Sequence, residues 1–167
     1  ETAGIRAGLL GTVRYEIGDR VLPAQRTTPE AADLQAYLAQ MVRAGCTACV
    51  MEVSSHALAL QRVRGIEFDL AVFTNLTQDH LDFHGDMEHY FAAKQQLFLG
   101  AGGPPPVSAV INHDDEWGRK IALHSSTARL TYGLQAGADV RAENIDAGFH
   151  GLTFDVRYPG GRLRLAS

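Results

Sequence analysis

The sequence predicts an α/β fold in which a mostly parallel sheet is flanked by helices, with a small antiparallel segment at the C-terminal end. Short runs of consecutive apolar residues alternate with stretches whose apolar residues recur at helical spacing. Strands buried on both faces of a parallel sheet read as continuous apolar runs, and the intervening helices carry one apolar face. From residue 138 onward, apolar and polar residues alternate, which is typical of antiparallel hairpins. We therefore expect an α/β core over residues 1–137 and a hairpin or meander over residues 138–167.

The first elements along the chain are predicted to be a strand, a loop and a helix. Residues 9–15 predict the strand, and residues 16–26 predict the loop because they contain glycine, aspartate and proline. The segment Thr-Thr-Pro-Glu at 27–30 predicts the helix start, with a threonine cap and a proline in the first turn. Whether Thr27 or Thr28 is the cap stays open.

This helix is predicted to lead into a second buried strand. Its apolar residues share one face, and Gly45 ends it. Residues 47–53 form an apolar run that predicts a strand, interrupted near its end by Glu52. A short helix is expected to begin near Ser54 or Ser55.

The middle of the chain continues the alternation of strands and helices. An apolar run over residues 70–74 predicts a strand, a polar loop follows, and a helix comes next. The apolar residues on one face of that helix are Met87, Tyr90, Phe91, Leu97 and Phe98. Further strands are predicted at residues 107–111 and 128–132, with a helix over residues 114–124 between them.

Composition and charge narrow the possible functions. The 167 residues correspond to about one domain, and the first of them resemble the end of a helix entering a strand, so we expect a piece of a longer protein. A net charge of −4 gives no basic surface for nucleic acid. No apolar run reaches the roughly 18 residues of a membrane span, and no signal peptide is recognisable. Cys46 and Cys49 form a lone CxxC that predicts two buried thiols rather than a zinc site, which fits a cytoplasmic protein.

Three polar loops follow predicted parallel strands, where ligands of such sheets bind. They cover residues 52–56, 75–84 and 112–115. In the first loop, Glu52 ends an apolar strand, and a buried carboxylate needs a cation or hydrogen-bond donors. There are two alternative explanations for Glu52: a salt bridge with an arginine such as Arg62, and a role in a functional site.

Acidic and histidine side chains gather in the second loop. They are Asp79, His80, Asp82 and His84. A single histidine there would be interpreted as a surface residue, but four such residues just past a buried strand favour a site for a divalent metal or a phosphate. Oxygen ligands with one imidazole suit Mg²⁺ or Mn²⁺ better than zinc.

Lys94 is the strongest local indication of chemistry. It lies on the apolar face of its helix, four residues after Tyr90 and four before Phe98. Burial of an ammonium group costs free energy unless the group is paired, modified or placed in a site. A neutral lysine amine can add CO₂ to give a carbamate, which is a good Mg²⁺ ligand; a plain buried pair of lysine with aspartate is the alternative.

Two further groups are candidates for ligand contacts. Thr27 and Thr28 offer hydroxyls and free N–H groups to an anion at a helix N-terminus, although capping alone would explain them. Asn112 and Asp115 could cap the following helix, or hold a ribose or a base.

Five segments, taken in order, resemble the central domain of the Mur ligases. They are LLGTV (9–13), TTPEA (27–31), MEVSSHAL (51–58), FTNLTQDHLDFHGDMEHYFAAKQQLF (73–98) and INHDDEWG (111–118). The resemblance covers residues 9–118 well and residues 119–167 loosely. Within the family, it is greatest to the ligase that adds the third amino acid in peptidoglycan synthesis.

The resemblance implies a cytoplasmic ATP-dependent ligase. Such an enzyme joins diaminopimelate or lysine to UDP-N-acetylmuramoyl-L-alanyl-D-glutamate through an acyl phosphate, and Mg²⁺ offsets the repelling charges. By the same resemblance, Glu52, His80 and Lys94 are metal ligands and catalytic residues, Lys94 as a carbamate. The residues implied to contact the UDP-muramoyl substrate are Thr27, Thr28, Ser54 and Arg62, and Asn112 is implied to contact ATP.

The sequence departs from the family pattern in several places. Leu60 and Arg26 stand where some relatives have glutamine and asparagine. No G-x-x-x-x-G-K-[ST] phosphate loop occurs in the chain, and the resemblance implies that a uridine-binding domain and a C-terminal domain, its expected partners, lie outside it. We therefore expect the chain alone to be inactive.

Two alternative functions remain. One is another ligase of the superfamily, such as a folylpolyglutamate synthase or the next ligase of the same pathway; the TTPEA and EVSSHAL segments argue against both. The other is a non-catalytic nucleotide-binding domain. The joint presence of Glu52, His80 and Lys94 argues against this second possibility, because each is costly to hold without a ligand.

Overall fold

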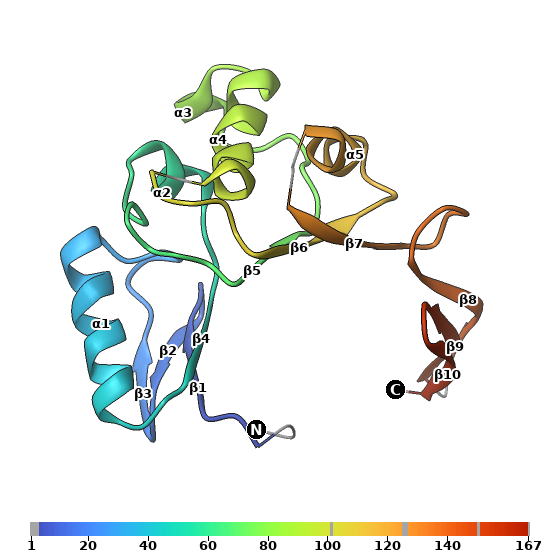
Figure 1. Cartoon of the computed structure of the whole chain (residues 1–167), viewed down its shortest axis with the longest axis horizontal. Helices are drawn as coiled ribbons and strands as arrows, with labels where there is room; N and C mark the ends of the chain where they lie inside the picture. Colours follow the sequence, from blue (N-terminus) through green and yellow to red (C-terminus); the bar gives the residue numbers. More distant parts are fainter. Residues whose placement is uncertain (1–3, 101, 125–126, 150, 167) are drawn as a thin grey trace. The chain divides into compact units, whose positions relative to one another are not determined.

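The computed structural model describes residues 4–100, 102–124, 127–149 and 151–166. It divides into two compact units. The first unit comprises Glu1–Ile66, Asp82–Gln96 and Ala101–Gly103, and the second comprises Glu67–Leu81, Leu97–Gly100 and Pro104–Ser167. Figure 1 gives the labels of the helices and strands in both units.

The first unit is built on a four-stranded sheet with the order β3-β2-β1-β4. Its strands are β1 (Ala7–Leu10), β2 (Arg14–Ile17), β3 (Arg20–Pro23) and β4 (Ala48–Met51). β1 and β4 run parallel, so their carboxyl ends lie side by side, whereas β1–β2 and β2–β3 are antiparallel.

The predicted loop over residues 16–26 is wrong in its first part. Residues 14–23 form a hairpin in which Ile17 pairs with Arg20 across Gly18 and Asp19. Gly18 adopts a φ of +61°, which glycine accepts at no steric cost in such a two-residue turn. The predicted single strand over residues 9–15 is therefore two strands, separated by a turn in which the Gly11 N–H donates to the Arg14 carbonyl.

Helices α1 (Ala31–Arg43) and α2 (Ser55–Ala59) belong to the first unit. The N-cap of α1 is Glu30, so the predicted threonine cap is wrong. The N-cap of α2 is Ser54, whose hydroxyl accepts a hydrogen bond from the Ala57 N–H, as the sequence predicts. Gly8 lets α1 pack closely on β1, because a Cβ at Gly8 would lie 2.3 Å from the Met41 Sδ.

The first of two further helices occupies the end of the loop predicted over residues 75–84, so that part of the prediction is wrong, and the second helix follows it. They are α3 (Leu81–His84) and α4 (Met87–Leu99). The second of these confirms the helix predicted from the apolar spacing. Tyr90, Phe91 and Phe98 are buried on it, and Lys94 is half-buried, as its place on the apolar face predicts.

The second unit contains a six-stranded sheet with the order β10-β9-β8-β7-β6-β5. Its strands are β5 (Leu70–Phe73), β6 (Ser108–Asn112), β7 (Ala128–Gly133), β8 (Val140–Gly148), β9 (Gly151–Tyr158) and β10 (Gly161–Ala166). β5 to β8 pair in parallel, and β8 to β10 pair antiparallel. The predicted fold class, with a parallel sheet and an antiparallel C-terminal segment, is confirmed.

Helix α5 (Glu116–His124) covers this sheet through its small and apolar residues. Trp117 and Ile121 are buried, and Gly118 faces the end of β6. A Cβ at Gly118 would lie 2.2 Å from the Asn112 carbonyl oxygen, so only glycine permits this approach.

The two cysteines are free thiols, as predicted. Cys46 is buried and Cys49 is half-buried in β4. Burial, and then the neighbouring Cys46, raise the pKa of the Cys49 thiol, which disfavours the reactive thiolate. Among the described residues, no helix has the length and apolar character needed to cross a membrane.

Candidate functional site

Glu52 lies at the carboxyl end of β4, beside the end of the parallel strand β1. Its backbone N–H donates to the Leu10 carbonyl at 2.9 Å. Its carboxylate Oε2 accepts a hydrogen bond from the Thr12 N–H at 3.0 Å and another, short one from the Thr12 hydroxyl. The carboxylate is thus held by donors from the turn after β1 and not by a salt bridge with Arg62.

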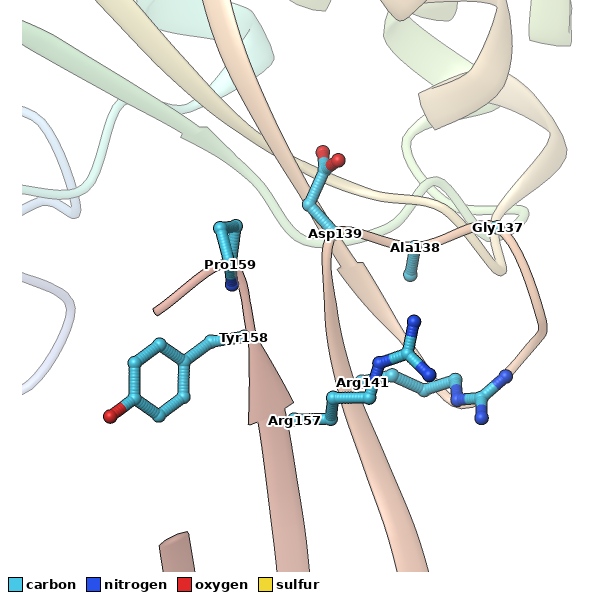
Figure 2. Close-up of a pocket in the computed structure, with 7 residues that line it drawn as sticks. All are labelled: Gly137, Ala138, Asp139, Arg141, Arg157, Tyr158 and Pro159. Carbon is cyan, nitrogen blue, oxygen red and sulfur yellow. The ribbon is translucent and has the colours of Figure 1, made fainter. Parts of the chain in front are cut away.

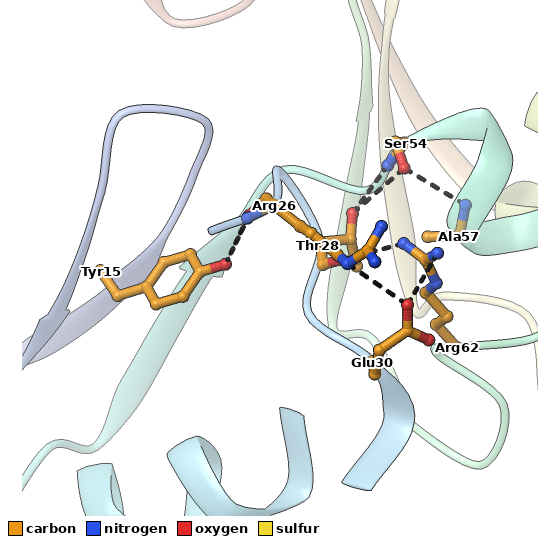
Figure 3. Close-up of polar contacts among 7 residues, drawn as sticks. All are labelled: Tyr15, Arg26, Thr28, Glu30, Ser54, Ala57 and Arg62. Carbon is orange, nitrogen blue, oxygen red and sulfur yellow. Dashed lines mark hydrogen bonds and ion pairs between the residues drawn. The ribbon is translucent and has the colours of Figure 1, made fainter. Parts of the chain in front are cut away.

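Thr27 and Thr28 lie beside Glu52 but have different environments. The Thr27 hydroxyl is half-buried and lies 3.1 Å from the Thr12 hydroxyl. The Thr28 side chain is 1% exposed. Its hydroxyl donates to the Glu52 carbonyl at 2.8 Å and accepts from the Ser54 N–H at 3.0 Å, so it connects the start of α1 with the end of β4 (Figure 3).

Arg62 completes this cluster on the side of α2. Its Nη2 lies 2.9 Å from the Glu30 carboxylate, and its Nη1 donates to the Thr28 carbonyl at 3.3 Å (Figure 3). The Arg62 Nε is buried and has no hydrogen-bond partner among the described residues. The carboxylate of Glu30 also pairs with Arg26 Nε at 3.4 Å, so two guanidinium groups share one acid.

Tyr15 fixes the loop that carries the threonine pair. The buried ring belongs to β2, and its hydroxyl accepts from the Arg26 N–H at 3.2 Å and donates to the Arg26 carbonyl (Figure 3). Tyr15 belongs to the predicted strand, and its pairing with Leu22 shows that the hairpin, whose second part was predicted to be a loop, helps to position it.

Lys94 lies in a separate aromatic group of the same unit. Its Nζ is 5.3 Å from the centre of the Tyr90 ring, a distance at which a cation is attracted by the ring. The His84 ring stacks on the same Tyr90 ring, with 5.0 Å between the two ring centres. His84 Nε2 is 2.9 Å from the Ser55 hydroxyl, so this group is connected to α2.

His80 belongs to the second unit, in the loop before α3. It has a φ of +54°, and its N–H donates to the Asp79 carboxylate at 2.8 Å. The imidazole Nε2 lies 3.4 Å from the other Asp79 oxygen. The imidazole is thus paired with its neighbour in sequence, and 46% of the side chain is exposed.

Asn112 and Asp115 have the local structural roles that the sequence left open. Asn112 Nδ2 donates to the Thr74 carbonyl at 2.7 Å, joining the ends of β5 and β6. Asp115 Oδ1 accepts from the Gly118 N–H at 2.9 Å at the start of α5, and its Oδ2 accepts from the Leu76 N–H. Burial, and then the charges of the neighbouring acids Asp114 and Asp115, raise the pKa of Tyr132 beside them.

The structure connects most of the predicted substrate residues, but it does not gather the predicted metal ligands in one unit. Thr27, Thr28, Ser54 and Arg62 surround Glu52 in the first unit, where Lys94 also lies, whereas His80 and Asn112 lie in the second. Among the described residues, no three His, Cys, Asp or Glu side chains form a group able to hold a metal ion.

The sequence analysis missed two residues of the cluster around Glu52. Thr12 follows the buried strand β1 directly, as Glu52 follows β4, and parallel strands end together, so their pairing could have been predicted. Glu30 was interpreted only as a first-turn residue of the helix, and nothing in its spacing pointed to Arg62.

The chain belongs to the Mur ligase family, as its middle domain. The family profile described as Mur ligase middle domain matches residues 1–167. The chain is 54% identical over 165 residues to the UDP-N-acetylmuramoyl-L-alanyl-D-glutamate--2,6-diaminopimelate ligase of Solibacter usitatus, covering 99% of this chain and 33% of that protein. It is 48% identical over 167 residues to the ligase of the same name from Bacillus licheniformis, covering 98% and 34%.

Solved structures agree with this assignment. A structure of a UDP-N-acetylmuramoyl-L-alanyl-D-glutamate--2,6-diaminopimelate ligase matches with a TM-score of 0.86 and 32% identity, over 99% of this chain and 34% of that one. A UDP-N-acetylmuramoylalanyl-D-glutamyl-2,6-diaminopimelate--D-alanyl-D-alanyl ligase from Acinetobacter baumannii, at 16% identity over 99% and 33% of the two chains, shares the fold with a TM-score of 0.68. The chain thus spans about a third of the length of these relatives.

Proposed function

We propose that this chain is the central part of a ligase that joins 2,6-diaminopimelate to UDP-N-acetylmuramoyl-L-alanyl-D-glutamate at the expense of ATP. The observation that carries the proposal is the 54% identity to a ligase of that name along nearly the whole chain. Because the chain spans a third of that relative, domains that bind the uridine group and the incoming amino acid would flank it in the full-length protein. We place this protein in the cytoplasm.

The reaction proposed has two steps. The γ-phosphoryl group of ATP is transferred to the substrate carboxylate, giving an acyl phosphate and ADP. The amine of diaminopimelate then attacks the acyl carbon, phosphate leaves, and the amine loses a proton. Both steps bring anions together, so positive charge near the carboxylate is the chief requirement.

The oxygen donors around Glu52 support a proposed Mg²⁺ site. Carboxylate and hydroxyl oxygens are the ligands Mg²⁺ prefers, and Glu52 offers the free lone pairs of an exposed carboxylate that Thr12 already orients. We propose Glu52, His80 and Lys94 as the residues that hold the metal, with Lys94 as a carbamate, because an ammonium group cannot be a ligand. When bound, the ion would neutralise charge on the reacting oxygens.

The proposed substrate contacts divide into groups that face the ligand and groups that support them. Thr28 is buried and its hydroxyl already makes two hydrogen bonds, so it supports the Glu52 and Ser54 backbone. Thr27 is half-buried, and because the Thr12 hydroxyl donates to Glu52, the Thr27 hydroxyl donates to Thr12 and keeps lone pairs that can accept from a ligand. Arg62 keeps a guanidinium with a free Nε, whose charge suits the muramoyl-peptide carboxylates or diphosphate.

The test is an assay of ADP release and product formation with the full-length protein. We expect turnover with UDP-N-acetylmuramoyl-L-alanyl-D-glutamate and diaminopimelate, at least tenfold above that with lysine. Glu52→Gln, which keeps the size but removes the charge, should lower kcat by about a hundredfold or more. Turnover with lysine alone, or unchanged kcat in Glu52→Gln, would contradict the proposal.

The Lys94 carbamate has its own measurement. Equilibration with ¹³C-labelled bicarbonate should give a carbamate carbon signal in the full-length protein that is absent from Lys94→Ala. Addition of a short carboxylic acid should restore part of the activity of Lys94→Ala, because it supplies the missing oxygen ligands. A wild-type protein without this signal would contradict the proposed carbamate.

A further inference from the structure

Three arginines form a row across the antiparallel part of the second unit. Arg141 of β8 lies directly opposite Arg157 of β9, and Arg157 lies directly opposite Arg162 of β10. Residues opposite one another in antiparallel strands project from the same face of the sheet. Like charges in such positions repel, so this row must be compensated by acids or by a ligand.

Acids two residues along the strands compensate the two outer arginines. Arg141 binds Glu143 through its Nε, at 2.7 Å, and through its Nη2. The hydrogen bond from Arg141, and after it the positive charges of Arg141, Arg157 and Arg162, hold the pKa of Glu143 below its usual range. Glu143 is therefore ionised at neutral pH. On the other side, Arg162 Nη2 donates to the buried carboxylate of Asp155 at 2.7 Å, and Asn144 donates to the same oxygen.

The central arginine has no such partner. Among the described residues, no carboxylate or carbonyl accepts a hydrogen bond from the exposed Arg157 side chain. The Nη1 group of Arg141 is also without an acceptor in this part of the chain, because Glu143 engages only Nε and Nη2. Arg141 and Arg157, which are adjacent, thus have the Glu143 carboxylate as their one hydrogen-bonded acid among the described residues, and it is bonded to Arg141.

Both guanidinium groups line a pocket with a volume of about 350 Å³. The segment Gly137–Asp139 bounds it on one side, and Tyr158 and Pro159 bound it on the other. Figure 2 shows the two guanidinium groups on the same side of the β8–β9 pair, beside Ala138. This volume is at the lower end of the range for small-ligand sites.

The pocket contains one carboxylate, and that carboxylate is engaged elsewhere. Asp139 accepts hydrogen bonds from the Thr131 N–H at 2.8 Å and the Thr131 hydroxyl at 2.7 Å. Its side chain points away from the two guanidinium groups in Figure 2. The positive charge of the pocket is thus left for a ligand.

We propose that this pocket binds a phosphate group, either inorganic phosphate or the terminal group of a phosphate monoester. The planar fork of Arg157 can take two phosphate oxygens at once, and Arg141 Nη1 can donate to a third. Phosphate carries between one and two negative charges at neutral pH, which offsets the repulsion along the arginine row, whereas a carboxylate would supply only one. The pocket lies in the antiparallel segment of the second unit, so the proposal is independent of the ligase reaction.

The test is a calorimetric titration of the full-length protein with inorganic phosphate. A second titration with adenosine monophosphate measures the binding of a phosphate monoester. Arg157→Gln should weaken the binding of phosphate by about tenfold or more, because it removes the charged, two-pronged donor. Arg157→Lys keeps the charge but not the fork and should bind with intermediate affinity. Tighter binding of the monoester than of phosphate would identify the pocket as a site for esters.

Arg164→Gln is the matched control. Arg164 lies on the same face of β10 as Arg162, and its side chain donates to the Thr153 hydroxyl at 3.4 Å, outside the pocket. This variant should bind phosphate within about twofold of the wild type, with the remaining loss due to long-range charge. Equal affinity in Arg157→Gln and the wild type, absence of phosphate binding by the wild type, or equally tight binding of acetate would each overturn the proposal.

Discussion

Thr28 is the residue on which the cluster around Glu52 depends most. Its hydroxyl is 1% exposed and satisfies both the Glu52 carbonyl and the Ser54 N–H. It thereby fixes the backbone on either side of the residue between them, Val53, and with it the direction of the Glu52 side chain. The hydroxyl of its neighbour, Thr27, has the Thr12 hydroxyl as its hydrogen-bond partner among the described residues.

The first prediction follows from this difference. Thr28→Val has the same shape but removes the partner of the part-buried Glu52 carbonyl and Ser54 N–H, so it should lower the free energy of unfolding by about 1 to 2 kcal/mol. Thr27→Val should lower it by less than about 0.5 kcal/mol, because its hydroxyl can be replaced by water. Urea denaturation of both variants measures the contrast, and equal losses would show that the Thr28 hydroxyl is not a structural link.

A second prediction concerns Thr12, which donates to the Glu52 carboxylate from its backbone and its side chain. Thr12→Val removes the hydroxyl and leaves the backbone N–H of residue 12 as the remaining donor, so the carboxylate is held less firmly. Groups that orient a metal ligand typically contribute about tenfold or more to metal affinity. We expect the Mg²⁺ concentration for half-maximal ADP release to rise by about tenfold in Thr12→Val. Thr12→Ser keeps the hydroxyl and serves as the control, so a similar rise in that variant would exclude the orienting role.

At the scale of elements, α5 approaches the end of β6 closely at Gly118. A Cβ at Gly118 would meet the Asn112 carbonyl oxygen at 2.2 Å, and a backbone atom cannot move aside as a side chain can. Gly118→Ala should therefore lower the free energy of unfolding by about 2 kcal/mol or more, despite the better helix propensity of alanine. Gly103→Ala, where a Cβ meets no atom within 4 Å, should be nearly neutral in the same denaturation experiment.

The connection from β7 to β8 gives a prediction that depends on pH. Hydrogen bonds from the Thr131 hydroxyl and N–H lower the pKa of Asp139 from its ordinary value. Because the pKa is lower in the folded than in the unfolded chain, ionised Asp139 stabilises the fold above about pH 4, and this contribution is lost as the pH falls through the folded-state pKa. Asp139→Asn should thus lower the free energy of unfolding at pH 7, by less than about 1 kcal/mol for so exposed a group.

Denaturation of the wild type and Asp139→Asn between pH 7 and pH 3 measures this effect. The difference between the two proteins should shrink below about pH 4. Thr131→Val removes one of the two donors and should show a smaller effect of the same sign. A difference that stays constant with pH would assign the effect to packing and not to charge.

The elements that the sequence predicted and those it missed differ in burial. Strands β5 and β6 and the helix carrying Lys94 each place apolar side chains in the core, and they were predicted because their apolar residues form runs or helical faces. The hairpin of β2 and β3 was missed because its outer strand is mostly exposed and ends in a proline, so its composition is that of a loop. The start of α1 was placed too early because Thr28 bonds the Glu52 carbonyl, a contact that sequence spacing does not reveal.

At the scale of the whole molecule, the family resemblance supplied what composition and spacing could not. The residues alone indicated an unusual lysine and a polar loop, and five ordered segments then pointed to the Mur ligases, which the family profile shows. The metal role of Glu52, His80 and Lys94 stays a prediction. Glu52 and Lys94 belong to the first unit and His80 to the second.

The last prediction concerns the 167-residue chain by itself. It contains no G-x-x-x-x-G-K-[ST] segment, and in proteins that use this motif, its backbone N–H groups and lysine hold the phosphates of the nucleotide. Positive charge at the transferred phosphoryl group accounts for much of the rate of such reactions. Neither the Glu52 carboxylate nor the Arg62 guanidinium replaces the N–H groups and the lysine of that motif. We expect ADP release by the isolated chain to equal that of a blank, under conditions in which the full-length protein turns over. ATP-dependent ligation by the isolated chain at a rate near that of the full-length protein would show that the chain has another means of holding the nucleotide.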